Sequence, residues 1–140
     1  MNHYVQIGVS GLVVGRGSTN APLSAIPSPP GGQVLRLGSD VPVGAPLFFD
    51  GSQVRVAPAA PSPFHVLQPK DGTWVLDEAA AWASVRSERE RRITATDWRV
   101  VRAQEDSRLL EPEWRAYRQA LRDITDQPDP LAIAWPTPPA

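Results

Sequence analysis

Side chains that could carry out catalysis are few in this sequence. There are two histidines, His3 and His65, and no cysteine. A catalytic histidine needs a nucleophile and an orienting acid nearby, and a metal site needs further ligands at compatible spacing. Neither pattern surrounds the two histidines. We therefore expect no metal site, and we interpret His65 as a hydrogen-bonded residue of a sheet.

The glycine-rich stretch that begins at Gly8, GVSGLVVGRGS, has the glycine content of a phosphate-binding loop. It lacks the Gly-Lys-Ser/Thr ending that contacts phosphate and magnesium. Ser10 stands two residues after Gly8, as in a nucleophile elbow, but Leu12 stands where the second glycine of that motif belongs. The glycines therefore predict turns rather than nucleotide binding or nucleophilic catalysis.

Paired carboxylates could support general acid–base chemistry, and Asp97 and Asp123 are the candidates. Each neighbours a Trp or an Arg in a predicted helix, which favours capping or ion pairing instead. Because no set of nucleophile, base and acid is recognisable, the sequence predicts a protein that is not an enzyme, with no catalytic residue and no cofactor.

Composition narrows the function further. The chain has 140 residues and a formal net charge of -1, so no overall basic field favours nucleic acid. The run SERERR at residues 87–92 is typical of a solvated helix face, since Glu88 and Glu90 dilute its charge. The apolar run GLVVG is too short to cross a membrane, and the N-terminal residues do not resemble a signal peptide. We expect a protein that is made and used in a cytoplasm.

Residues 1–62 predict a β-rich N-terminal module with many Gly and Pro residues. The connector at residues 19–32 contains too many prolines to form a helix. Asp50-Gly51 predicts a hairpin turn, and the stretch APAAPSP at residues 57–63 predicts a linker. Short strands are expected at Tyr4–Ile7, Leu12–Val14, Val34–Leu37, Leu47–Phe49 and Val54–Val56.

Residues 63–140 predict a short hairpin, two antiparallel helices and an extended Pro-rich tail, which makes the whole chain α+β. The hairpin joins strands at 64–67 and 74–76. The helices are expected at about 78–100, capped by Asp77, and at about 112–125, begun by Pro112. The tail reads LAIAWPTPPA.

Helical periodicity identifies the expected core of this second part. The first helix places Trp82, Val85, Arg89 and Ile93 on one face. The second repeats Trp114, Tyr117, Leu121 and Ile124 at intervals of three and four, a narrow stripe suited to packing on one partner helix.

The remaining aromatic and basic residues are candidates for partner binding. Trp135 and Pro136 lie in the tail and either dock into a partner or fold back onto the chain's own helices. Trp98 lies off the main stripe of its helix and packs against the β part or a partner. Arg118 and Arg122 are one helical turn apart, and acidic groups of the chain or of a partner would offset their repulsion. These five residues form the predicted partner-binding set.

Three segments together resemble the phage tail assembly chaperone proteins, which are similar in style to tail-fibre assembly chaperones. In order they are RRITATDW at residues 91–98, WRAYRQALRDI at residues 114–124, and Trp135-Pro136 with a closing proline. The resemblance covers about residues 77–139. It departs from the family pattern at Ile93 and Thr94, where members often carry a Leu pair.

This resemblance implies a non-enzymatic protein that binds a phage tail fibre or other tail protein in the host cytoplasm and assists its folding or assembly. Fibre chains are β-rich and slow to find their register, so a partner that covers exposed strand edges would suppress aggregation. The alternative is a virion structural protein retained on the tail or fibre tip, for which residues 1–62 would serve as an attachment module. Whether the chain forms a homo-oligomer is left open.

Overall fold

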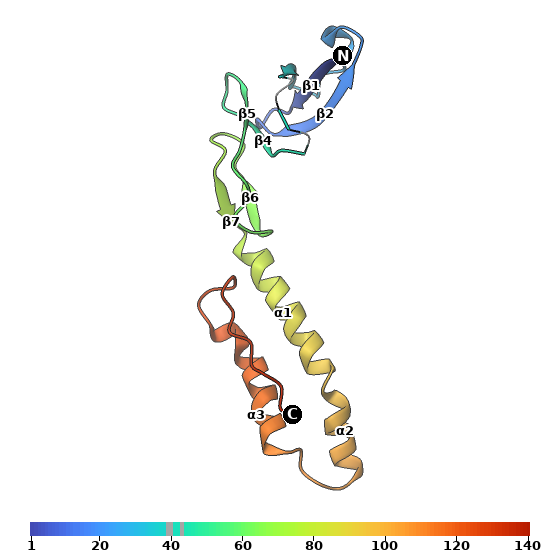
Figure 1. The fold of residues 1–140 in the computed structure, drawn as a ribbon, viewed down its shortest axis with the longest axis vertical. Coiled ribbons are helices and arrows are strands. Elements are labelled where there is room, and N and C mark those ends of the chain that lie inside the picture. Colours follow the sequence, from blue (N-terminus) through green and yellow to red (C-terminus); the bar gives the residue numbers. More distant parts are fainter. Residues whose placement is uncertain (39–40, 43) are drawn as a thin grey trace. The chain divides into compact units, whose positions relative to one another are not determined.

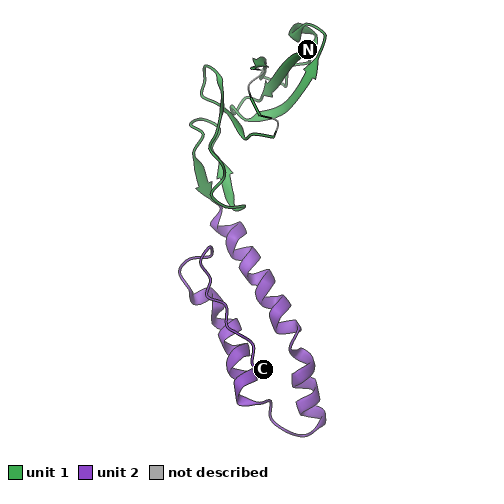
Figure 2. Cartoon of the chain, viewed as in Figure 1, with its two compact units in different colours: residues 1–76 green, residues 77–140 purple. Residues whose placement is uncertain are grey.

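The computed structural model describes residues 1–38, 41–42 and 44–140, and the chain forms two compact units (Figures 1 and 2). The first unit is Met1–Leu76 and the second is Asp77–Ala140. The sequence suggested a boundary after residue 62 instead. The stretch at residues 57–63 is tied to the following hairpin, because the indole nitrogen of Trp74 donates to the carbonyl of Pro58 at 2.9 Å. The hairpin therefore groups with the strands that precede it.

The described residues of the N-terminal unit form three small antiparallel sheets. The first has the strand order β2-β1-β3, the second pairs β4 with β5, and the third pairs β6 with β7. The strands are β1 Asn2–Ile7, β2 Val13–Thr19, β3 Gln33–Leu37, β4 Leu47–Phe49, β5 Val54–Val56, β6 His65–Leu67 and β7 Trp74–Leu76, and the connector holds a short 3-10 helix, η1 Leu23–Ala25. Every predicted strand is present, and β2 extends further than the prediction did.

Alternation along β1 gives the first sheet two different faces. Val5 and Ile7 are buried and form a core with Leu47 of β4. On the opposite face, Tyr4 pairs with Gly17 of β2. A Cβ atom at Gly17 would lie 2.6 Å from the Tyr4 hydroxyl, so the tyrosine ring occupies the space above this glycine. The absence of a side chain at residue 17 is what lets the ring lie across the sheet.

The predicted Asp50-Gly51 turn joins β4 to β5. One carboxylate oxygen of Asp50 accepts from the backbone N–H groups of Ser52 and Gln53, each at 2.9 Å. These bonds, with a further one from Arg55, lower the pKa of Asp50 to about 2. Gly51 has a positive φ of 95°, a conformation that favours glycine.

The second unit, which we call the helical unit, contains three helices and a short 3-10 segment. They are α1 Glu78–Thr94, α2 Asp97–Glu105, α3 Pro112–Arg122 and η2 Asp123–Asp126. The single helix expected at about 78–100 is therefore wrong in detail: it breaks at residues 95–96 and resumes as α2. The second predicted helix is confirmed as α3 with η2, and α3 runs back beside the other two helices (Figure 1).

Both predicted start signals act as expected in this unit. Asp77 caps α1 by accepting from the backbone N–H of Ala80 at 2.9 Å, and Pro112 begins α3. The stripe on α3 is buried, and Trp114, Tyr117 and Leu121 form the centre of the core. Ile124, which belongs to η2, is also buried. Within the described residues, no helix has the length and apolar character needed to span a membrane.

Candidate protein-binding surface

The break between α1 and α2 is held by a side chain from α3. Nη1 of Arg118 donates to the carbonyl of Ile93 at 3.1 Å and to Oγ1 of Thr96 at 2.5 Å. Nη2 of Arg118 donates to Oδ1 of Asp97 at 2.8 Å. The Thr96 hydroxyl in turn donates to the same Ile93 carbonyl at 2.7 Å. We call these four residues the helix joint.

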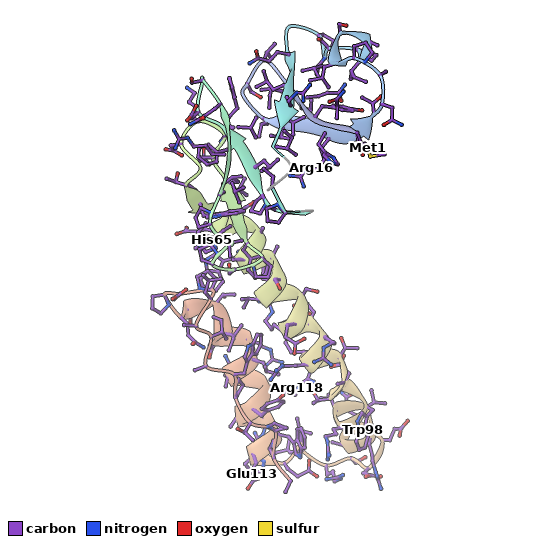
Figure 3. The ribbon with its side chains drawn as sticks, turned by 45° about the horizontal axis from the view of Figure 1, so that its top comes forward. Met1, Arg16, His65, Trp98, Glu113 and Arg118 are labelled. Atoms are coloured by element: carbon purple, nitrogen blue, oxygen red, sulfur yellow. The ribbon has the colours of Figure 1, made fainter. Side chains whose placement is uncertain are left out.

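The joint matches the charge distribution of the two helix ends. The last carbonyls of α1 carry partial negative charge and attract the guanidinium of Arg118, while the carboxylate of Asp97 lies in the first turn of α2, where anions are favoured. Arg118 is only 9% exposed and lies between α3 and the α1–α2 pair (Figure 3). The charge of Arg118 is therefore paired inside the helical unit, where this side chain sets the position of α2.

A stack of rings and a guanidinium lies near the start of α3. The guanidinium of Arg99 lies 3.8 Å from the ring centroid of Trp114 and 4.6 Å from that of Trp98. Trp114 meets Tyr117 edge to face at 5.8 Å. Such contacts each contribute about 0.5–1.5 kcal/mol beyond burial. Trp114 is buried, but Trp98 remains 53% exposed on α2, so half of its surface is open to a partner.

The tail folds back on the helices through a clasp. The side-chain amide of Gln127 makes two hydrogen bonds with the backbone of Ala134, at 2.8 and 3.2 Å. This pairing closes the loop after η2 and brings Trp135 against the core cluster of α3. The guanidinium of Arg92 lies 4.3 Å from the Trp135 ring centroid.

Arg92 is itself held by a carboxylate on α1. Glu88 accepts from Arg92 at 2.7 Å and from Arg91 at the same distance. Hydrogen bonds from Arg91 and Arg92 lower the pKa of Glu88 to about 2. The predicted charge run thus contains the ion pairs expected of a helix face, and one of its arginines also covers the tail tryptophan.

The five predicted partner-binding residues have different surroundings in the structure. Arg118 lies in the helix joint, and Trp135 packs within the helical unit, followed by the half-buried Pro136. Trp98 and Arg122 are exposed, on α2 and α3 respectively. Of the five, only these last two are exposed.

A groove of about 600 Å³ runs between α2 and α3. Five of its seven lining residues lie outside the predicted partner-binding set. Arg115 and Arg122 are seven residues apart on a helix, and that spacing is the signal that would have placed them on one side of α3. The groove is lined by Val100, Leu110, Arg115, Ala116, Arg118, Gln119 and Arg122.

The side chain of His65 takes part in a hydrogen bond within the N-terminal unit. Nδ1 of His65 lies 2.8 Å from the hydroxyl of Ser62, the hydrogen bond that the sequence interpretation anticipated. Within the described part of the chain, no group of three or more His, Cys, Asp or Glu residues is arranged to hold a metal ion.

One comparison with known proteins finds a match for most of the helical unit. No curated protein and no solved structure matches the chain. The model of one family, described as phage tail assembly chaperone protein, matches residues 82–140. The matched segment contains the helix joint, the Arg99 stack, the groove and the clasped tail. Residues 82–140 of this chain are therefore similar to the phage tail assembly chaperone family.

Proposed function

We propose that the helical unit binds a phage tail fibre or another tail protein and assists its folding or assembly in the host cytoplasm. The observation that carries this proposal is the family match, which spans nearly the whole helical unit. The unit is also suited to binding, because it combines an exposed tryptophan with an open groove. Interfaces concentrate their binding energy in a few Trp, Tyr and Arg residues.

The five residues of the predicted partner-binding set contribute in two ways under this proposal. Trp98 and Arg122 contact the client directly, since both are exposed. Arg118, Trp135 and Pro136 act through the shape of the unit. Arg118 sets the position of α2, and Trp135 with Pro136 holds the tail against the helices. Loss of a contact residue lowers affinity alone, whereas loss of a shaping residue lowers stability as well.

Co-expression with each tail protein of the same phage tests the proposal. The measurements are the soluble fraction of the tail protein and its co-purification with the tagged chain. We expect at least one tail protein to become more soluble and to co-purify, and Trp98→Ala to weaken the complex while lowering the melting temperature only slightly, through the lost contact with Arg99. Val75→Ala, which changes another exposed apolar residue outside the helical unit, serves as the control. Failure of every tail protein to respond would refute the proposal.

A second candidate function is a structural role in the virion. It is favoured by one observation: residues 1–76 form a unit with its own core, outside the segment that the family model matches. Such a unit could attach the chain to a mature tail. Protein analysis of purified particles separates the two roles, because a structural component is retained and a transient chaperone is not.

A further inference from the structure

Three apolar residues line the groove between α2 and α3. Val100 comes from α2, Leu110 from the loop before α3, and Ala116 from α3 itself. Val100 and Leu110 are half-buried, and Ala116 is exposed. The volume of about 600 Å³ falls in the range of about 300–1,000 Å³ that is common for ligand pockets. The groove is therefore large enough to take apolar side chains from a partner.

Two exposed arginines on α3, Arg115 and Arg122, line the same groove. Among the described residues neither forms an ion pair with a carboxylate, whereas Arg108 and Arg118 of the same unit both do. Asp123, which follows Arg122, instead accepts from the side-chain amide of Gln119 at 2.8 and 3.1 Å. The groove therefore keeps two positive charges that the described residues leave without a carboxylate partner.

The tail leaves this groove open. The residues that line it all belong to α2, α3 and the loop between them, and they include none from the tail. The tail tryptophan instead lines a different pocket with Val85 and Glu88 of α1.

We propose that the groove between α2 and α3 binds an acidic, apolar segment of the client protein. Arg115 and Arg122 are seven residues apart, so they are separated by two helical turns and about 10 Å along the axis. The complementary segment carries two carboxylates at about that spacing, with apolar side chains between them that cover Val100 and Leu110. This inference rests on the proposed function, and it adds the chemistry of the segment that is recognised.

A pair of synthetic peptides tests the inference on the full chain. One is a helix-forming peptide with two glutamates seven residues apart and leucines between them, and the other has lysines in place of the glutamates. Binding is measured by nuclear magnetic resonance chemical-shift changes in the labelled protein. We expect the glutamate peptide to shift the resonances of Val100, Leu110 and Gln119, and to bind more weakly as salt is added. Equal binding of the lysine peptide would overturn the inference.

Charge reversal supplies the matched comparison. Arg115→Glu with Arg122→Glu changes the groove, and Arg36→Glu with Arg86→Glu makes the same charge change at exposed positions elsewhere. Losing two exposed attractions and adding two repulsions should weaken peptide binding at least about fourfold. The control pair should bind as the wild type does. If the groove variant melts early, Arg115→Gln with Arg122→Gln replaces it, with a smaller loss expected.

The same variants separate this inference from the proposed function. If wild type binds no tail protein in co-expression, the proposed function fails. If wild type binds a tail protein and the groove variant binds it equally well, the function stands and the groove assignment is wrong.

Discussion

Replacing Arg118 by alanine is expected to lower the melting temperature of the helical unit strongly, because the joint between α1 and α2 loses its only donor from α3 among the described residues. The variant removes three hydrogen bonds, to Ile93, Thr96 and Asp97. Hydrogen bonds that involve a charged group contribute about 1.5–3 kcal/mol each, but their sum overstates the loss. The magnitude follows from what each partner does after the arginine has gone.

The partners of Arg118 differ in how well they tolerate its loss. The Ile93 carbonyl keeps its bond from the Thr96 hydroxyl. The side chain of Asp97 is 53% exposed and can be hydrated by water. Breaking a fully buried ion pair costs about 3–5 kcal/mol, so a half-exposed one costs less. Together with the lost packing of the side-chain stem, we expect about 2–4 kcal/mol.

Thermal melting followed by circular dichroism measures this loss. One kcal/mol shifts the melting temperature of a domain of this size by about 4–8 °C, so the predicted decrease is about 8–32 °C. Arg118→Lys should recover less than half, since an ammonium group lacks the planar fork. Arg122→Ala is the matched control, because it removes an exposed arginine one turn away and should cost no more than about 0.5 kcal/mol. A loss below about 1 kcal/mol for Arg118→Ala, or a loss equal to that of the control, would refute the role of the joint.

Three further variants test the helical unit. Leu121→Ala removes a side chain with 0% exposure and should cost about 2–5 kcal/mol in a urea titration, whereas an unchanged midpoint would contradict its place in the core. Trp135→Ala should lower the melting temperature by loosening the tail; unimpaired client binding by the folded fraction would show that the tail is an internal clamp only. Glu88→Gln should be less stable than wild type above about pH 4.5, and the difference should vanish as the pH falls towards 2, because the folded-state pKa of Glu88 is lowered to about 2. A difference that grows on acidification would contradict that assignment.

Features governed by local spacing could be predicted from the sequence. The strands are short runs with β-branched or other apolar residues between turn residues, and the stripe from Trp114 to Ile124 has the period of a helix. The break after α1 could not be predicted this way, because no Gly or Pro interrupts ITATDW. It is stabilised instead by Arg118, which is 22 residues from Thr96 along the chain. The two residues are close in space but far apart in the sequence, so helical periodicity does not indicate this hydrogen bond.

The candidate surface was predicted less well than the fold, for a related reason. An arginine at helical spacing from another arginine indicates a charged strip, but it does not say which of the two turns inward. Arg118 turns inward because Asp97 and the end of α1 lie opposite it. The sequence allows both an internal and an external role for Trp135. Its packing depends on the clasp between the Gln127 side chain and the backbone of Ala134, and sequence patterns do not indicate such a pairing.

The ring of Tyr4 lying over Gly17 has a consequence for how this chain can vary among its relatives. Residues 4 and 17 share one volume across the β1–β2 pair, so their sizes should be inversely related. A relative with alanine or serine at residue 17 should carry a smaller or differently oriented residue at position 4, and the large aromatic should recur only beside glycine. Residues 6 and 15 form a second pair of the same kind, since a Cβ at Gly15 would meet the side chain of Gln6. Amino-acid substitutions at these positions of the sheet are therefore expected to occur in pairs, one on each strand, rather than singly.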